Sequence, residues 1–288
     1  MRKRGAMRDL PDGLDLDVLR AHRPIGHDLG ALLRRIEQHL DDADGYLAFS
    51  GGKDSLVALH LARQVDPNVP VVFFDSGAEY PETYSYISDL ADRWGLNFSV
   101  YPSDPPLLQY LAESGAWDLT ASTTASEHPL HDVLITQPAS RAHSDHGPGE
   151  IWGVRADESV KGSGRWSLYH RALAEQVDRN CRGCCTTRQQ QRDRHGGKVE
   201  RADGTVAFGP IWNWSRDDVW AYIARTRLPL NPVYTILRDL GVPEQQHRVS
   251  HIIDASFLER GRVTWLKRGW PSLFEELATV LPRLHEFS

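Results

Sequence analysis

Two glycines directly after a short apolar run give the sequence its clearest chemical signal. Residues 46–50 are Tyr-Leu-Ala-Phe-Ser, and Gly51, Gly52 and Lys53 follow before a stretch with helical spacing of apolar residues. A strand, a glycine turn and a helix in this order form a nest of backbone amides at a helix N-terminus, to which Lys53 adds a full positive charge. The pattern predicts a phosphate site, with an ordinary strand-to-helix turn as the alternative.

Two familiar phosphate loops do not fit these residues. A Walker loop requires a glycine where this chain has Leu47, and Ser or Thr where it has Asp54. The third glycine of a dinucleotide fingerprint is absent as well. The loop at residues 50–55, Ser-Gly-Gly-Lys-Asp-Ser, is therefore of another kind.

Residues 50–55 resemble the SGGKDS loop, or PP-loop, of the N-type ATP pyrophosphatases. More narrowly, they resemble the phosphoadenosine phosphosulfate (PAPS) reductase family, which includes the small subunit of ATP sulfurylase. Three later segments are similar to that family in the same order. They are residues 75–77 with 80–83, residues 153–159 (Gly-Val-Arg-Ala-Asp-Glu-Ser) with Arg165, and residues 210–234, which begin Pro-Ile-Trp-Asn-Trp-Ser and end Asn-Pro-Val-Tyr. The resemblance covers residues 46–235.

The resemblance implies an adenine nucleotide site, with ATP or the sulfonucleotides PAPS and APS as substrate and with Mg²⁺ as a cofactor. The residues expected to contact the nucleotide are Ser50, Gly51, Gly52, Lys53, Asp54, Ser55, Asp75, Gly77, Glu158 and Arg165. Lys53, Asp54 and Arg155 are the expected catalytic residues of this part of the chain. Taken singly, Asp75 has a turn cap as its alternative, and each arginine has a surface role.

The resemblance leaves the reaction open between an adenylyl- or sulfur-transferase and a sulfonucleotide reductase. Pyrophosphatase-type members cleave ATP between the α and β phosphates, and the sequence favours this version. Reductase members use a cysteine in a C-terminal E-C-G-x-H tail, whereas the last cysteine here is Cys185. A reductase would therefore use Cys184 or Cys185 as its catalytic thiol. Outside enzymes, the alternative is a nucleotide-dependent module that binds nucleic acid without turnover.

All three cysteines, Cys181, Cys184 and Cys185, fall within five positions, which excludes a disulfide framework. Their spacing is compatible with a zinc or iron–sulfur site, with His195 as a further ligand, with a redox thiol pair, or with reduced structural cysteines. The basic residues around them are Arg179, Arg182, Arg188, Arg192, Arg194, Lys198 and Arg201. This patch at residues 179–201 predicts either docking of tRNA, DNA or another anionic acceptor, or a solvated basic loop. A sulfur-donor or reductant protein is a further expected partner.

The elements around these motifs alternate between strands and helices. Continuous apolar strands are predicted at 46–50, 69–74, 97–101, 150–154 and 205–211, and helices at 81–94, 105–113 and 215–225. This order predicts an α/β fold with a doubly wound, mostly parallel sheet, Rossmann-like and, by the resemblance, adenine nucleotide alpha-hydrolase-like. The expected organisation is a helical appendage at 1–45, a PP-loop nucleotide-binding domain at 46–235 with a Cys/Arg-rich insertion at about 179–204, and a helical region at 236–288. Residues 120–150 are expected to be a loop around a short helix, or a lid.

The bulk composition is that of an ordinary globular chain. The 288 residues carry a net charge of −6, which argues against a nucleic-acid binder over its whole surface. No apolar run approaches the roughly 20 residues of a membrane span, and the start lacks the apolar core of a secretory signal. A cytoplasmic protein without a membrane partner is therefore expected, and the sequence predicts no oligomeric state.

Overall fold

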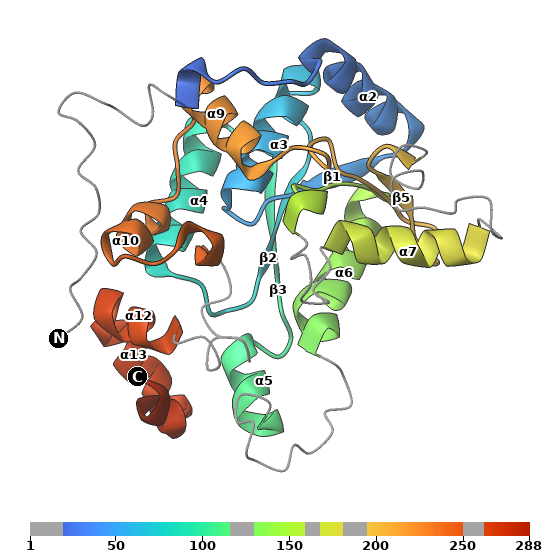
Figure 1. Ribbon diagram of the computed structural model, residues 1–288. Helices are drawn as coiled ribbons and strands as arrows, with labels where there is room; N and C mark the ends of the chain where they lie inside the picture. Colours follow the sequence, from blue (N-terminus) through green and yellow to red (C-terminus); the bar gives the residue numbers. More distant parts are fainter. Residues whose placement is uncertain (1–19, 116–129, 159–167, 181–194, 250–261) are drawn as a thin grey trace.

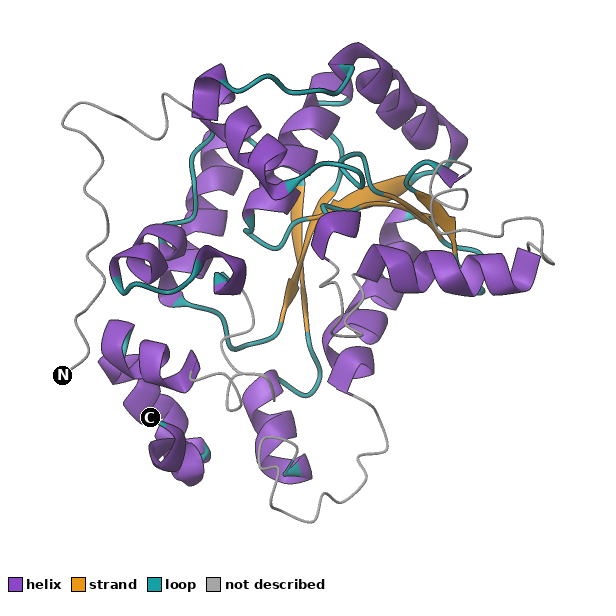
Figure 2. Ribbon diagram, in the orientation of Figure 1, coloured by secondary structure: helices purple, strands orange, loops and turns teal. Residues whose placement is uncertain are grey.

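The computed structural model describes residues 20–115, 130–158, 168–180, 195–249 and 262–288. Six strands form a single sheet in the order β3-β2-β1-β4-β6-β5. Helices cover both faces of this sheet, as Figure 1 and Figure 2 show. The predicted class, a doubly wound and mostly parallel α/β sheet, is confirmed.

The strands are β1 (Gly45–Ala48), β2 (Val71–Asp75), β3 (Phe98–Pro102), β4 (Gly149–Ile151), β5 (Lys198–Glu200) and β6 (Val206–Phe208). The helices are α2 (Leu29–Asp42), α3 (Lys53–Val65), α4 (Pro81–Trp94), α5 (Leu107–Ser114), α6 (Gln137–His146), α7 (Leu168–Asn180), α9 (Arg216–Thr226), α10 (Val233–Asp239), α12 (Arg262–Gly269) and α13 (Pro271–Val280). Short helical turns are η1 (Asp132–Thr136), η2 (Ala156–Glu158), η3 (Glu244–Gln246) and η4 (Pro282–Phe287).

The strand order reverses beside β1. From β1 the chain adds β2 and then β3 outward on one side, and β4, β6 and β5 lie on the other side. The pairs β1–β2, β2–β3, β1–β4 and β4–β6 are parallel, and β5–β6 is antiparallel. The carboxyl ends of β1 and β4 therefore flank the point where the sheet changes direction.

Successive residues of the central strands face opposite sides of the sheet, as pleating requires. Leu47 and Phe73 pack in the core that includes α2, α3, α4 and α9. Tyr46 and Val72 instead pack with Ala142 of α6 on the opposite face. Because both faces are buried, these strands have continuous apolar runs rather than alternating ones.

Two helices begin and end where local sequence signals predict. In α4, Pro81 occupies the first turn, and Gly95 closes the helix in the left-handed conformation at φ 58°. In α9, Ser215 and Asp218 form a capping box, with Asp218 N donating to Ser215 Oγ at 3.1 Å and Ser215 N donating to Asp218 Oδ2 at 2.9 Å. Both predicted helices are confirmed.

Two elements differ from the prediction, and a third segment lies only partly in the described residues. In the segment 120–150, expected to be a loop around a short helix or a lid, residues 130–146 are helical through η1 and α6, and residues 120–129 lie outside the described part. Helix α7 was not predicted, although Tyr169, Leu173 and Val177 recur every four residues and are buried. Strand β5 lies inside the expected insertion at 179–204 and pairs along the sheet edge.

The chain before α2 packs against α9, near the end of the resembling segment. Arg225 of α9 donates to the backbone oxygens of Ala21 and Arg23. His27 stacks on Trp214 with a ring separation of 5.1 Å. Trp212, Trp214 and Trp220 are all buried and pack in the hydrophobic clusters of the fold. Among the described residues, none of the helices combines the length and the apolar character needed to cross a bilayer.

A buried histidine in α2 makes the stability of the fold depend on pH. Burial, with a contribution from Lys198, lowers the pKa of His39 to about 4. The neutral ring therefore stabilises the fold fully above the unfolded-state pKa of about 6.5, and this contribution is lost as the pH falls toward 4. Between pH 7 and pH 5 we expect the wild-type protein to lose about 2 kcal/mol more unfolding free energy than His39→Leu. Urea denaturation at both pH values tests this expectation, which equal losses in the two proteins would contradict.

Candidate functional site

The reversal of strand order brings two loops together at the carboxyl edge of the sheet. Residues 50–55 follow β1, and residues 152–158 follow β4. The loops touch at Gly153, where a Cβ atom would lie only 2.5 Å from the backbone nitrogen of Ser55, so that only glycine permits this approach. Doubly wound sheets bind their ligands in the crevice at such a reversal.

The first loop has the form of an anion site. Gly51 adopts φ 71°, a left-handed conformation that glycine takes without strain. Ser55 closes the loop, because its hydroxyl accepts from Ser50 N at 3.3 Å and donates to the oxygen of Gly52 at 3.0 Å. Helix α3 begins at Lys53, so its first backbone N–H groups have no partner within the helix and its N-terminus attracts negative charge.

Two residues from late in the chain form hydrogen bonds with the backbone of this loop. The backbone N–H of Lys53 donates to the hydroxyl of Tyr234 at 2.9 Å. The side-chain amide of Asn231 donates to the oxygen of Gly51 at 3.4 Å and to Thr83 Oγ1 at 3.0 Å. Sequence reasoning placed Asn231 and Tyr234 within a resembling segment but did not identify them as residues of the site. Their position within that segment is the sequence signal by which they could have been identified as residues of the site.

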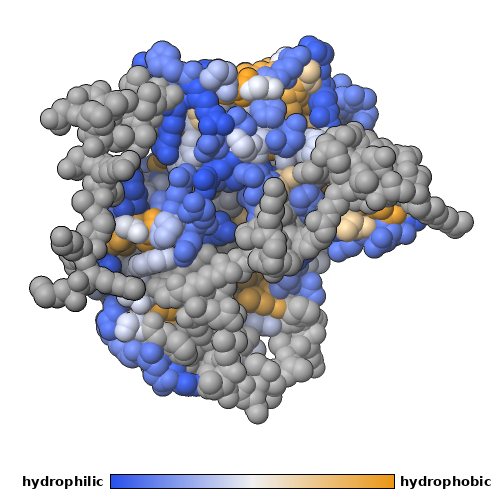
Figure 3. Space-filling model, viewed as in Figure 1, coloured by the Kyte–Doolittle hydropathy of each residue, from blue (hydrophilic) through white to orange (hydrophobic). Residues whose placement is uncertain are grey.

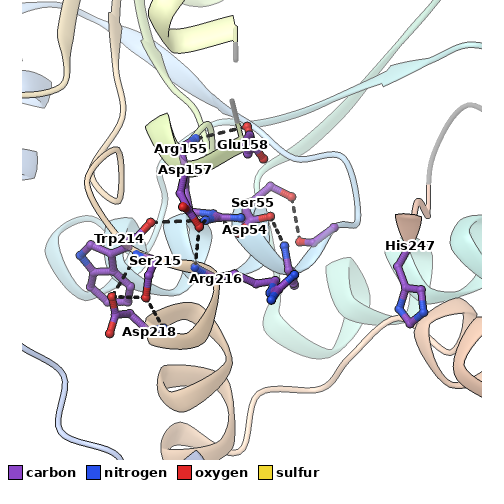
Figure 4. Close-up of polar contacts among 12 residues, drawn as sticks. Asp54, Ser55, Arg155, Asp157, Glu158, Trp214, Ser215, Arg216, Asp218 and His247 are labelled. Carbon is purple, nitrogen blue, oxygen red and sulfur yellow. Dashed lines mark hydrogen bonds and ion pairs between the residues drawn. The ribbon is translucent and has the colours of Figure 1, made fainter. Parts of the chain in front are cut away.

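Asp54 lies between two cations. Its Oδ2 accepts from Lys53 Nζ at 2.5 Å, and its Oδ1 accepts from Arg155 Nε at 2.6 Å. Arg155 is only 4% exposed and also donates to Asp157 Oδ2 at 3.2 Å and to the oxygen of Trp214 at 3.3 Å. Figure 4 shows Arg155, Asp157 and Arg216 on one side of Asp54 and His247 well apart on the other. The Arg155 guanidinium therefore already donates to acceptors within the protein.

Two further titratable groups lie around Lys53. Glu158 is exposed toward the cavities it lines, yet desolvation of its carboxyl and the charge of Asp54 raise its pKa. Burial, and to a smaller extent the charge of Lys53, lowers the pKa of His247, whose Nε2 lies 2.9 Å from the oxygen of Val242. Around Lys53 the structure therefore raises the pKa of a carboxyl and lowers the pKa of a histidine.

A cavity of about 470 Å³ opens over the loop. Its polar lining includes Ser50, Lys53, Asp54 and Glu158. Its apolar lining includes Phe49, Val72, Phe73, Phe74, Ile135, Trp152 and Val154. The volume and the mixture of apolar walls with a few polar groups are typical of small-molecule sites. We call this space the main cavity.

Two smaller cavities adjoin the main cavity. One of about 400 Å³ shares Lys53, Glu158 and Tyr234 with it, and one of about 380 Å³ shares Phe74 and Trp152. Figure 3 shows that the described surface on this side is mostly hydrophilic, with small separate hydrophobic areas. The main cavity therefore connects, through shared lining residues, to a space on each side.

Asp75 and Gly77 occupy a turn beside the site. Asp75 Oδ1 accepts from Gly77 N at 2.8 Å and from the hydroxyl of Tyr84 at 2.7 Å. Neither residue is among those that line the three cavities. In this structure Asp75 therefore acts as a turn cap, which was the alternative expected for it.

Several predicted residues lie outside the described part of the chain. These are Arg165, Cys181, Cys184, Cys185 and four arginines of the basic patch, Arg182, Arg188, Arg192 and Arg194. His195 is described. Within the described ranges, no group of three His, Cys, Asp or Glu residues comes close enough together to hold a metal ion.

The described basic residues of the patch each have an acceptor in the protein. Arg179 donates to the backbone oxygen of Glu200 at 2.5 Å. Lys198 pairs with Asp42 at 3.3 Å, and Arg201 pairs with the buried Glu150. These three side chains anchor the edge of the sheet, in addition to any role toward a partner.

A family model and the sequence relatives point to one family. A family model described as "Phosphoadenosine phosphosulfate reductase domain" matches residues 45–236. The phosphoadenosine 5'-phosphosulfate reductase of Thiocapsa roseopersicina is 30% identical over 198 residues, covering 68% of this chain and 66% of that protein. The enzyme of the same name from Xylella fastidiosa (strain M12) is 29% identical over 208 residues, covering 68% of this chain and 69% of that protein. Among solved structures, the PAPS reductase of Candida auris is similar with a TM-score of 0.46 and 18% identity, covering 74% of this chain and 90% of that one.

Proposed function

The chain belongs to the phosphoadenosine phosphosulfate reductase family, and on this premise we propose that it is a cytoplasmic enzyme that binds an adenine nucleotide at residues 50–55. The observation that carries the proposal is the main cavity, where the amide-rich start of α3 and Lys53 meet apolar walls. Amides and an ammonium suit phosphates, and aromatic and aliphatic walls suit a purine. The loop would thus hold the phosphate end and the walls the base.

The proposed nucleotide contacts are divided between the two loops. Residues 50–55 would hold phosphate, with Lys53 neutralising charge that develops there. Glu158 is the carboxylate that fits a Mg²⁺ ion beside the phosphates, because both oxygens of Asp54 already pair with cations. Such an ion would offset phosphate charge. Arg155 would act as a positioning residue, since it holds Asp54. Contacts from Asp75, Gly77 and Arg165 stay predictions.

Sulfonucleotide reduction is the reaction that we propose first, because the relatives named PAPS reductase support it. The thiolate of Cys184 or Cys185 would attack the sulfur of the sulfate group, and the nucleotide phosphate would leave with the electron pair of the broken S–O bond. A second thiol would then attack the cysteine sulfur, releasing sulfite as a disulfide forms. The second candidate is cleavage of ATP between the α and β phosphates. The cavity of about 400 Å³ beside Lys53 favours this reaction, because its volume and its basic lining residues would accommodate pyrophosphate.

Product analysis separates these two reactions. With PAPS or APS and a dithiol reductant, we expect the wild-type protein to release sulfite. In the Cys184→Ser/Cys185→Ser variant, sulfite release should fall to the uncatalysed background while nucleotide affinity is kept. Sulfite release that persists in this variant would contradict the thiol assignment. Pyrophosphate from ATP, without sulfite from either sulfonucleotide, would establish the second candidate.

The remaining assignments are also proposals. The division into residues 1–45, 46–235 and 236–288 stays a proposal from the sequence. In the structure α2 shares a hydrophobic core with α3 and α4, and the C-terminal helices share another with α5 and α10. We propose residues 179–201 as the docking site for an anionic acceptor or for a reductant protein. Iron, zinc and sulfide analysis of anaerobically purified protein would decide between a metal site and free thiols at Cys181, Cys184 and Cys185.

A further inference from the structure

Residues 80–83, Tyr-Pro-Glu-Thr, lie at the start of α4, beside the loop at residues 50–55. The carboxylate of Glu82 accepts from the indole N–H of Trp270 at 2.9 Å. Tyr80 packs on the same indole, with a ring separation of 4.3 Å. These two residues therefore attach α4 to the C-terminal helices, whereas Thr83 makes a different set of contacts.

Thr83 lies in the middle of a buried hydrogen-bond network. Its hydroxyl accepts from the side-chain amide of Asn231 at 3.0 Å and donates to the backbone oxygen of Val249 at 2.6 Å. The same amide of Asn231 donates to the oxygen of Gly51 at 3.4 Å. Thr83, Asn231 and Val249 are 0%, 1% and 4% exposed, so water has little access to replace any of these partners. The network therefore connects the phosphate loop with Val249 through one hydroxyl group.

The groups at the two ends of the network fix the direction of its hydrogen bonds. The backbone oxygen of Val249 can only accept, so the Thr83 hydroxyl gives its proton to Val249 and presents a lone pair to Asn231. At the other end, the backbone N–H of Val233 can only donate, and it donates to Asn231 Oδ1 at 3.0 Å. The amide nitrogen of Asn231 is therefore oriented toward Thr83 and Gly51. Loss of the Thr83 hydroxyl would leave this nitrogen without its closer acceptor.

Val249 belongs both to the network and to the wall of the main cavity. Residues 247–249 line this cavity, and Gly52 lines it beside them. A Cβ atom placed on Gly52 would lie 3.7 Å from Val249 Cγ2, so the Val249 side chain lies directly beside the loop. The hydrogen bond from Thr83 holds the backbone of Val249 in this place. The loop and the adjoining part of the cavity wall therefore depend on the same hydroxyl.

We propose that Thr83 is a positioning residue for the phosphate loop. Through Asn231 it holds the oxygen of Gly51, and with it the turn at φ 71° that directs the backbone amides of the loop toward an anion. Thr83 is not among the residues that line the three cavities, so it acts on a ligand through Asn231 and Val249. This inference rests on the proposed function, because the expected ligand of the loop is an adenine nucleotide.

Two variants separate the hydroxyl of Thr83 from the volume of its side chain. Thr83→Val has nearly the same shape without the hydroxyl, whereas Thr83→Ser keeps the hydroxyl. In Thr83→Val we expect about tenfold weaker binding of whichever of PAPS, APS and ATP the wild-type protein binds, because two buried groups lose their partner. Thr83→Ser should bind this nucleotide within about twofold of the wild-type affinity. Calorimetric titration measures both affinities.

Adenosine distinguishes positioning of the loop from general damage to the cavity. It carries no phosphate, so its affinity should stay within about twofold of the wild-type value in both variants. The matched control is Thr226→Val, which removes a hydroxyl that donates to the backbone oxygen of Tyr222 at 2.6 Å in α9. This control should change neither affinity.

Three results would overturn the proposal. The first is an unchanged nucleotide affinity in Thr83→Val. The second is an equal loss in Thr83→Val and Thr83→Ser, which would assign the effect to packing rather than to the hydroxyl. The third is an equal loss for the nucleotide and for adenosine in Thr83→Val, which would show general damage to the cavity.

A second measurement requires no nucleotide. The backbone N–H of Gly52 belongs to the same peptide group as the oxygen of Gly51, so its ¹⁵N–H signal reports on the hydrogen bond from Asn231. This signal should move in Thr83→Val and should stay near its wild-type position in Thr83→Ser and Thr226→Val. If it does so in a protein that binds no adenine nucleotide, the positioning of the loop stands and the proposed function fails. If the wild-type and Thr83→Val proteins bind a nucleotide equally well, the positioning role fails and the proposed function stands.

Discussion

Replacement of Lys53 by alanine is expected to weaken binding of PAPS, APS or ATP about a hundredfold. Loss of one charged hydrogen bond to phosphate weakens binding about tenfold to a hundredfold. Here the loss should lie at the upper end, because Lys53 also pairs with Asp54 at 2.5 Å. Without the lysine, one carboxylate oxygen would face the phosphates unpaired and repel them. Calorimetric titration of the wild-type and variant proteins measures the effect.

The matched control for this prediction is Lys267→Ala. Lys267 is an exposed lysine on α12 that donates to Ser288 Oγ at 2.9 Å, so its removal should leave nucleotide affinity unchanged. The repulsion is tested by adding Asp54→Asn to Lys53→Ala, which should recover part of the lost affinity. Unchanged binding in a well-folded Lys53→Ala protein would remove the basis of the proposed function.

Replacement of Arg155 by alanine is expected to lower the free energy of unfolding by about 3 kcal/mol, even without nucleotide. Breaking a buried ion pair costs about 3–5 kcal/mol, because a charge is left without its partner. Asp54 keeps Lys53, which places the expected cost at the lower end of this range. The oxygen of Trp214 would also lose its guanidinium donor. Urea denaturation measures the change.

Two further variants define what this result means. Arg238→Ala removes an arginine whose side chain is 68% exposed, so its effect should stay within about 0.5 kcal/mol. Arg155→Lys keeps the charge but loses the forked geometry that reaches both Asp54 and Asp157, so we expect only partial recovery. A fully stable Arg155→Ala protein with weakened nucleotide binding would show that Arg155 serves the ligand and not the scaffold.

The fold could be predicted from the sequence where local signals and burial agree. Helix α4 begins at Pro81 and ends before Gly95, and α9 has its capping box, so local chemistry alone marks them. Strand β5 had no such signal, because only Val199 of its three residues is buried and its pairing with β6 is decided by tertiary structure. Helix α7 did have a signal, an apolar residue at every fourth position, which sequence reasoning missed.

The candidate site likewise contains residues that could be predicted from the sequence and residues that could not. The loop at residues 50–55 is contiguous, so its glycines and Lys53 could be recognised together. Tyr234 could not be placed at that loop, because no local pattern relates it to a backbone amide 181 positions earlier. Asp75 matched the family pattern, but strand-ending aspartates also cap turns, and the hydrogen bonds to Gly77 and Tyr84 take that form here.

The hydrogen bonds that Asn231 and Tyr234 make to the loop also constrain how the protein is made. Gly51 and Lys53 leave the ribosome about 180 residues before the side chains that hold them, as the separations of 180 and 181 positions show. At translation rates of about 5–20 residues per second, roughly 10 to 35 seconds pass between the two events. During that interval the nascent chain contains the loop but not the hydrogen bonds from Asn231 and Tyr234 that hold it. Competence to bind a ligand at this loop should therefore arise late in synthesis, after residue 234 has emerged.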